Sequence, residues 1–485
     1  MKSRQVLTVA EMGRADAAAI AAGTSGLALM ERAGTAVADA VCSRFARQAA
    51  LVLCGPGNNG GDGYVAARVL KGRGWPVAVR SFGEPATQDA QAASARWAAV
   101  AEGATKPLNG HLEPGVWIDA LFGAGLSRAL DGPAAAAALR MAEAPERVVA
   151  VDVPSGVPGD TGRPIGPAAC AALTVTFHAK KPAHLLEAGR DRCGEVVVAD
   201  IGLGATQSQT HENGPELWLP RFPWPTAASH KHARGRLVVV SGEVWSTGAA
   251  RLAARAALRI GAGLVTILSP PEALAVNAGH LEAVMLKGFE TDLELEQAAR
   301  AVDAAIIGPA AGVGEPTLLN VLALARTGAA LILDADAITV FRDDPEELFS
   351  LLDRDDVLTP HVGEFERLFP GLLAASPERI TAARTAAERA GAVVLLKGSD
   401  TVIAAPDGRC AVNANGSPWL ATAGSGDVLA GFIGGLVAQG MESFEAACAG
   451  AWIHAEAAEL HGPGLISEDL PGLAPSVLRR LFDER

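Results

Sequence analysis

Short apolar runs alternate with longer mixed stretches along the first half of the chain. The runs are rich in Val, Ile and Leu and are too short for helices, which is typical of buried strands. Strands are predicted at 51–54, 77–80, 116–119, 148–151, 173–177 and 196–199, and helices at 27–45, 65–71, 88–101 and 134–142. Because strands separated by helical crossovers pair in parallel, the first half is predicted to be a doubly wound α/β unit.

The alternation stops between about residues 203 and 234, where Pro, Gln, Asn, Trp and His occur with little periodicity. It then restarts, with strands predicted at 237–240, 264–268, 305–307, 330–333, 356–358, 393–396 and 402–405. Helices are predicted at 249–260, 426–439 and 443–461. The break predicts a linker with a boundary near 205–225. We therefore expect two doubly wound α/β domains, at 1–210 and 220–485.

Composition narrows the classes of protein that fit. A chain of 485 residues with 49% hydrophobic and 20% charged residues is typical of two globular domains. The net charge of −13, without a basic stripe, argues against nucleic-acid or anionic-membrane partners. No apolar stretch is long enough for a membrane span, and the N-terminus leads into an amphipathic helix rather than an apolar h-region, so no signal peptide is predicted. The six cysteines lack zinc-ligand spacing, which favours reduced thiols and a cytoplasmic location.

A glycine-rich loop at 55–63 follows the first predicted strand, and Asp119 and Asp152 end the third and fourth. Ligands of open parallel sheets bind at the carboxyl ends of the strands, so these loops are expected to share one crevice. Glycine lets backbone N–H groups converge on an anion. Carboxylate, amide and hydroxyl oxygens suit K⁺, Na⁺ or Mg²⁺ better than zinc, and a carboxylate free of metal can transfer protons. A plain glycine turn with aspartate helix caps is the alternative, and convergence of three loops argues against it.

The second half has a different glycine–aspartate motif, at 423–427, directly before an apolar helix. Its N–H groups are predicted to form an anion site beside the Asp427 carboxylate. That arrangement predicts a phosphate-bearing ligand and a general base. Among other polar residues, His178, Lys180 and Lys181 are expected to be solvated or structural, and Cys54 and Tyr64 to pack in the core.

The first half resembles the N-terminal epimerase domain of the NAD(P)H-hydrate repair enzymes. The matching motifs are at 56–63, 119–126, 151–156 and 200–202, within a resemblance that spans roughly 8–204. It implies a Rossmann-like fold in which Asp152 is catalytic and contacts the hydrated nicotinamide, and in which Asn59, Asp119 and Ser155 bind K⁺. It also implies a set of substrate-binding residues, namely Asn58, Asn59, Gly60, Gly61, Asp62, Gly123, Ala124, Gly125, Leu126, Ser127, Arg128, Ala129 and Asp152.

The second half is similar to the nucleoside-diphosphate-dependent dehydratase domain of the same enzymes, which is ribokinase-like. The matching motifs are at 241–266, 333–338, 358–368, 396–404 and 413–436. The resemblance implies that Ala249, Gly312, His361 and Asp427 surround the hydrated cofactor, with Asp427 catalytic. It implies nucleotide binding by Lys397, Gly398, Ser399, Asp400, Thr401 and Gly426. Two departures are visible: 308–312 reads Gly-Pro-Ala-Ala-Gly where Gly-Pro-Gly-Leu-Gly is usual, and Ser425 replaces a common Thr.

The resulting prediction is a bifunctional repair enzyme for NADHX and NADPHX. The first domain would interconvert R and S epimers by loss and return of water, with a carboxylate moving the proton. The second would dehydrate the S form with ADP and a nucleotide-bound Mg²⁺, because a phosphoryl group turns a poor leaving group into a good one. Residue chemistry leaves ADP or ATP open, and fusion of the domains favours ADP. A homo-oligomer is expected.

Two other readings remain. The second half could be an ordinary kinase for a vitamin or sugar hydroxyl, with the first half a binding module. The first half could also be a non-enzymatic interaction scaffold. The acidic balance of the chain and the intact Asn58–Asp62 segment, Asp119 and Asp152 argue against the scaffold.

Overall fold

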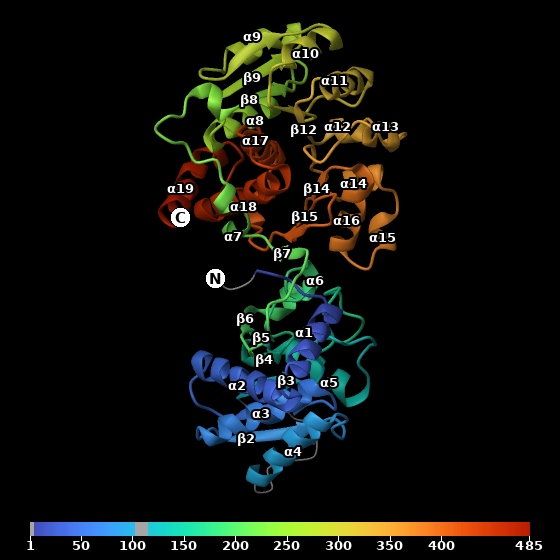
Figure 1. Ribbon diagram of the computed structural model, residues 1–485, viewed down its shortest axis with the longest axis vertical. Helices are drawn as coiled ribbons and strands as arrows, with labels where there is room; N and C mark the ends of the chain where they lie inside the picture. The colour runs from blue at the N-terminus through green and yellow to red at the C-terminus, as the bar shows by residue number, and fades with distance from the viewer. Residues whose placement is uncertain (1–3, 102–114) are drawn as a thin grey trace. The chain divides into compact units, whose positions relative to one another are not determined.

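The protein was analysed as a computed structural model that describes residues 4–101 and 115–485. The chain divides into two compact units, Met1–Thr210 and His211–Arg485 (Figure 1). The point of division lies inside the range, 205–225, in which the sequence predicts a boundary. Both units are of the α/β class, as expected.

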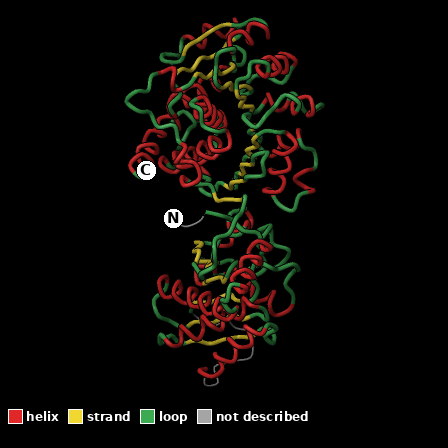
Figure 2. Tube along the Cα trace, in the orientation of Figure 1, coloured by secondary structure: helices red, strands yellow, loops and turns green. Residues whose placement is uncertain are grey.

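The first unit is built on a six-stranded, wholly parallel sheet in the order β2-β1-β3-β4-β5-β6. Figure 2 draws the strands of the chain in yellow and the helices in red. Its strands are β1 (Ala50–Cys54), β2 (Val77–Ser81), β3 (Val116–Ala120), β4 (Val148–Val151), β5 (Leu173–Phe177) and β6 (Glu195–Ala199). Its helices are α1 (Val9–Ala21), α2 (Gly26–Arg44), α3 (Asn58–Gly72), α4 (Gln88–Ala101), α5 (Gly132–Glu143) and α6 (Glu187–Cys193). Each predicted strand is present to within one residue at either end.

Successive residues of β1 enter different cores on the two faces of this sheet. Val52 and Cys54 pack in a cluster with α2, α3 and α4, whereas Leu51 and Leu53 pack in a cluster with α5. When helices cover both faces of a sheet, the side chains of a central strand are buried at every position. This explains the unbroken apolar runs in the sequence. Tyr64 is buried in the first cluster and Cys54 with it, as predicted.

Helix α3 begins earlier than the sequence predicted. The segment expected to be a glycine loop is helical from Asn58 onward, with Gly57 as an extended N-cap at φ −88° and ψ −168°. Glycine was read as a loop signal, but at 60 and 63 it permits close packing of the helix. A Cβ on Gly60 would lie 1.9 Å from the Gly55 carbonyl oxygen, and one on Gly63 would lie 2.5 Å from the Ala120 side chain. Close packing therefore overrides helix propensity here.

The second unit has a ten-stranded sheet in the order β10-β9-β8-β11-β12-β13-β14-β15-β16-β7. The run from β10 to β14 is parallel, and β15 and β16 pair antiparallel, so the sheet is mixed. Its strands are β7 (Thr210–Glu212), β8 (Arg236–Val240), β9 (Leu264–Ser269), β10 (Met285–Gly288), β11 (Ala304–Ile307), β12 (Ala330–Leu333), β13 (Val357–Leu358), β14 (Val393–Leu396), β15 (Val402–Ala404) and β16 (Cys410–Val412). The segment predicted as linker contributes β7 and the buried Trp218.

Helices of the second unit are α7 (Pro215–Trp218), α8 (Thr247–Ile260), α9 (Pro271–Ala278), α10 (Asp292–Ala299), α11 (Glu315–Ala325), α12 (Asp336–Thr339), α13 (Pro345–Phe349), α14 (Val362–Leu368), α15 (Leu372–Ala375), α16 (Arg379–Ala390), α17 (Ser425–Ala438), α18 (Ser443–His461) and α19 (Leu470–Asp483). Helix α17 is buried from Val428 to Ala438. Gly431 and Gly435 let it approach α8 closely, since a Cβ on Gly431 would lie 2.3 Å from the Ala253 carbonyl oxygen. This packing fixes the direction of α17, and so the position of its N-terminal loop. Within the described part of the chain, no helix combines the length and apolarity that a membrane crossing needs.

Candidate active sites

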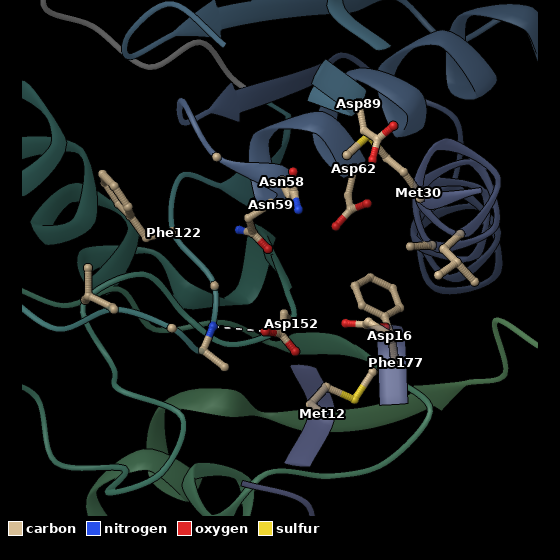
Figure 3. A pocket seen from close by; sticks show the side chains of 18 of the residues that line it. Met12, Asp16, Met30, Asn58, Asn59, Asp62, Asp89, Phe122, Asp152 and Phe177 are labelled. Atoms are coloured by element: carbon tan, nitrogen blue, oxygen red, sulfur yellow. Dashed lines mark hydrogen bonds between the residues drawn. The ribbon is translucent and has the colours of Figure 1, made fainter. Parts of the chain in front are cut away.

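The first unit contains a cavity of about 570 Å³ at the carboxyl edge of its sheet (Figure 3). Loops that follow β1, β3 and β4 line it, together with α1 and α2. Most of the residues predicted to bind substrate in this unit lie there, namely Asn58, Asn59, Asp62, Gly123, Ala124, Gly125, Leu126, Ser127, Arg128 and Asp152. Gly60, Gly61 and Ala129 do not line the cavity, and both glycines are buried in packing.

Asp152 directly follows β4 and has a left-handed backbone, with φ at +67°. Residues held in this region cluster at functional sites, and aspartate tolerates it better than most. Its Oδ2 accepts a hydrogen bond from Ala124 N at 2.9 Å, drawn dashed in Figure 3. Its Oδ1 lies 2.8 Å from Lys181 Nζ and accepts from Thr176 Oγ1 at 3.0 Å. Burial alone would raise the pKa of Asp152, but the Lys181 charge and these hydrogen bonds lower it to about 2.

The sequence did not single out the residues that hold Asp152. Lys181 is only 2% exposed and paired with Asp152, so of the two roles predicted for it, solvated or structural, the structure excludes the solvated one. His184 lies 2.8 Å from the Asp152 carbonyl oxygen through Nε2, and burial lowers the pKa of His184 to about 4. Both residues follow β5, whose carboxyl end is at the same edge of the sheet as β4. Ligands of parallel sheets bind at the carboxyl ends of the strands, and applying this rule to β5 as well would have placed Lys181 and His184 at the site.

Asp119 differs from its predicted position because it is completely buried and does not line the cavity. Its carboxylate accepts hydrogen bonds from Ser155 Oγ at 2.6 Å and Ser155 N at 2.8 Å. Burial raises the pKa of Asp119 to about 6, against the lowering effect of those bonds. Among the described residues, the Asp119 carboxylate has no cationic partner. A buried carboxylate with a serine hydroxyl beside it, and with the Oδ1 of Asn59 as an amide oxygen, is a set of oxygens that fits a monovalent cation.

In the second unit, Lys397, Asp334 and Glu364 form a charged cluster. Lys397 Nζ lies 2.7 Å from Asp334 Oδ1 and 3.8 Å from Glu364 Oε2. Gly426 adjoins the cluster, since a Cβ there would lie 3.5 Å from Asp334 Oδ2 and 3.6 Å from Lys397 Nζ. The structure therefore brings together Lys397 and Gly426, both predicted nucleotide-binding residues. Asp334 and Glu364 were not predicted, although Asp334 directly follows β12 at the carboxyl edge.

Asp427 lies in the first turn of α17, after Gly424 with φ at +88°. Its carboxylate is close to the same cluster. Burial and the Asp334 charge raise the pKa of Asp427 to about 6, while Lys397 opposes the shift. The first N–H groups of a buried helix are free to bind an anion. The site thus pairs an anion-binding helix terminus with a carboxylate whose pKa is close to neutral.

The remaining residues predicted for this unit have local structural contacts. His361 is the N-cap of α14, and its Nδ1 accepts from Gly363 N at 2.9 Å and Glu364 N at 3.2 Å. Gly312 donates its N–H to Asp336 Oδ2 at 2.8 Å. In the unusual 308–312 run, Ala310 has φ at +53°, a conformation that glycine adopts more readily. Ala249 lies in the first turns of α8.

The predicted nucleotide loop 397–401 follows β14. Gly398 N donates to Thr401 Oγ1 at 3.1 Å, which closes the turn. The Asp400 side chain is 2% exposed and lies 3.1 Å from Arg379 Nε, so it points into the protein rather than toward a ligand. Among the residues that the structure describes, no three His, Cys, Asp or Glu side chains cluster as metal ligands.

Two Asp-bearing sites at the carboxyl edges of two α/β sheets define a two-site enzyme with one Rossmann-like and one ribokinase-like unit. The family model described as NAD(P)H-hydrate dehydratase matches residues 237–463, and that described as YjeF-related protein N-terminus matches 26–183. The chain belongs to the family of bifunctional NAD(P)H-hydrate repair enzymes.

Relatives match along almost the whole chain. The bifunctional NAD(P)H-hydrate repair enzyme of Moorella thermoacetica is 37% identical, over 99% of this chain and 97% of its own length. That of Gloeobacter violaceus is 38% identical, over 93% and 92% respectively. A ribokinase-like superfamily protein from Enterococcus faecalis has the fold of the second unit. It is 23% identical, the match covers 57% of this chain and 98% of that one, and the TM-score is 0.51. The ADP/ATP-dependent NAD(P)H-hydrate dehydratase of Bacillus subtilis, crystallised with ATP and Mg²⁺, is 28% identical. The match covers 53% of this chain and 94% of that one, with a TM-score of 0.47.

Proposed function

We propose that this chain repairs hydrated NADH and NADPH at two separate sites. The unit at 1–210 interconverts the R and S epimers of NAD(P)HX, and the unit at 220–485 dehydrates the S form to NAD(P)H. The observation that carries the proposal is the end-to-end similarity to bifunctional repair enzymes, 37% over 99% of the chain. Fusion is chemically reasonable, because spontaneous hydration produces both epimers and the second site accepts one.

At the first site, the substrate is a hemiaminal with a hydroxyl on the ring carbon beside nitrogen. We assign its binding to the cavity residues described above and contact with the ring to Asp152. Asn59, Asp119 and Ser155 would hold K⁺, whose positive charge would offset the buried Asp119 carboxylate. The set of oxygens supports this assignment, as does the finding that no cationic side chain among the described residues pairs with Asp119.

At the second site, ADP donates a phosphoryl group to the ring hydroxyl, and elimination then gives NAD(P)H, AMP and phosphate. Asp427 would accept the hydroxyl proton, and the N–H groups of the α17 terminus would bind the transferring phosphoryl. Lys397, Gly398, Ser399 and Thr401 would bind the nucleotide, whose Mg²⁺ would neutralise phosphate charge. Asp334 and Glu364 are further carboxylates at this site that fit such a cation.

We also infer a cytoplasmic enzyme that forms a homo-oligomer and has no nucleic-acid partner. All six cysteines are free thiols, which fits a reducing compartment. Light scattering would test the oligomer directly, and a monomeric mass would contradict it.

The function is tested by incubating the chain with a mixture of hydrated NADH epimers and ADP, ATP or no nucleotide. Return of the dihydronicotinamide absorbance is expected with ADP only, and from both epimers. Dependence on ATP would correct the donor. If no nucleotide restores absorbance while a vitamin or sugar alcohol is phosphorylated, the second unit is an ordinary kinase and the proposal is wrong.

A further inference from the structure

Four carboxyl groups line the cavity of the first unit, those of Asp16, Asp62, Asp89 and Asp152, and their surroundings differ. Asp152 is saturated with donors, since Lys181, Thr176 and Ala124 together contact both of its oxygens. A carboxylate with a pKa near 2 is protonated in only about one molecule in 10⁵ at pH 7. Asp152 is therefore well suited to remain an anion and poorly suited to deliver a proton.

Asp62 has the opposite environment. It projects from α3 into the cavity, and in Figure 3 it faces Asp152 from the other side. Among the described residues, no hydrogen bond or ion pair holds its carboxyl group. Burial raises the pKa of Asp62 well above its usual value, and the charges of Asp152 and Asp16 raise it further. These surroundings favour the protonated form of Asp62 more than water does for an exposed aspartate.

The other charged groups around the cavity do not reverse this contrast. They come from α1, from α4, from the loop after β3 and from the segment after β5, and are Asp16, Asp89, Arg128 and Lys181. Burial raises the pKa of Asp16, but the Lys181 charge acts on it in the opposite direction, as it does on Asp152. Lys181 has no such influence on Asp62. Lys181 thus opposes the rise in pKa at Asp16 and Asp152, whereas at Asp62 no charge among the described residues does so.

We propose that Asp62 is the acid–base group of epimerisation and that Asp152 stays ionised to stabilise the cationic ring. This inference rests on the function proposed for the first unit. It assigns two carboxylates in one site to two roles according to their surroundings.

The reaction balances with these two groups and water. Asp62 gives its proton to the ring hydroxyl, the C–O bond breaks, and water leaves with the bonding electrons. The ring nitrogen lone pair forms a C=N bond, and the resulting cation lies beside the Asp152 anion. Water then adds to the opposite face of the ring, and the proton that it loses returns to the Asp62 carboxylate, through the released water where needed. Nothing is oxidised or reduced.

The test uses full-length chain with pure R-NADHX, and separates the epimers chromatographically without nucleotide. Asp62→Asn is expected to lower the epimerisation kcat at least about 100-fold, the usual contribution of a general acid. Dehydration of S-NADHX with ADP by the same preparation should be unchanged, which shows that the second unit is intact; a thermal unfolding profile like that of wild type shows the same for the first unit. Asp39→Asn, on the exposed surface of α2, is the matched control and should leave epimerisation unchanged.

Chemical rescue distinguishes an acid from a residue that merely shapes the cavity. Added formate should restore epimerisation at least about tenfold in Asp62→Ala and not in Asp152→Ala. In heavy-oxygen water, the wild-type enzyme should incorporate solvent oxygen into the ring hydroxyl as fast as it epimerises. A wild-type rate in Asp62→Asn, rescue of Asp152→Ala alone, or inversion without oxygen exchange would each overturn the inference. If wild-type protein fails to interconvert the epimers at all, the proposed function itself is wrong.

Discussion

Lys181 and Asp152 form an ion pair inside the first unit, with Nζ and Oδ1 2.8 Å apart. The Lys181 side chain is 2% exposed and that of Asp152 is 17% exposed. Burying two charges is costly, and removal of one leaves the other without compensation. Lys181 therefore contributes both to the stability of the first unit and to its function, because the same lysine keeps the Asp152 carboxylate ionised in the substrate cavity.

Replacing Lys181 with Met should destabilise the first unit by about 3 kcal/mol, since the Asp152 charge is left unpaired. Urea unfolding of the variant provides the measurement. A double-mutant cycle with Asp152→Asn is the control, and the double variant should be more stable than the sum of the single effects indicates. Strictly additive losses would show that the two side chains are not coupled.

Gly60 is predicted to tolerate no side chain, whereas nearby Gly57 should tolerate one. A Cβ on Gly60 would lie 1.9 Å from the Gly55 carbonyl oxygen, but one on Gly57 would have nothing within 4 Å. Gly60→Ala should destabilise the first unit by about 2–3 kcal/mol, because the start of α3 must move away from β1. Gly57→Ala is the matched control, with a stability close to that of wild type by thermal unfolding. Equal losses in the two variants would contradict the packing argument.

Most strands that are fully buried could be predicted from the sequence, although β16 (Cys410–Val412), with only three residues, was missed. β4 (Val148–Val151) is fully buried, and its bounds were predicted to the residue. β10 (Met285–Gly288) was missed, because it is an edge strand whose residues are mostly exposed and include Lys287. An edge strand has no continuous apolar run, so periodicity carries little information about it.

The sequence predicts those site residues that lie within a single recognisable loop, but not the residues that the fold brings to them from elsewhere in the chain. Asp152 and Asp427 each belong to a glycine-containing segment that is visible in the sequence. Their charged neighbours are not, because Lys397 is 63 positions from Asp334 and only the pairing of β12 through β13 to β14 brings them together. Lys181 likewise looks like part of a polar turn until β5 pairs with β4.

The second unit should become less stable as pH rises, because the buried carboxyl group of Asp356 loses its proton. It is 5% exposed, and burial raises its pKa to about 7, against hydrogen bonds from Leu331 N and Asp353 N. A raised folded pKa means that the folded state binds the proton more tightly than the unfolded chain, whose value is about 3.9. The stabilisation is therefore complete below about pH 3.9 and is lost by about pH 7, amounting to up to about 4 kcal/mol.

Calorimetry between pH 4 and 8 would measure this dependence in the second unit. Asp356→Asn should flatten the pH profile, because its side chain no longer titrates. Asp343→Asn is the control, since the Asp343 side chain is 90% exposed, and it should retain the wild-type slope. If both variants keep that slope, another group is responsible for it.

The pH profile of dehydration should depend on Asp427. Burial and the Asp334 charge raise the pKa of Asp427 to about 6, and the Lys397 charge opposes them. A general base must be ionised, so kcat/KM for S-NADHX at saturating ADP should fall tenfold per pH unit below about pH 6. Removing the Asp334 charge with Asp334→Asn should move this limb to lower pH, and Lys397→Met should move it to higher pH. Epimerisation by the same proteins is the internal control and should keep its own profile. If the limb stays near pH 6 in both variants, Asp427 is not the titrating base, because its two charged neighbours could not then be changed without effect.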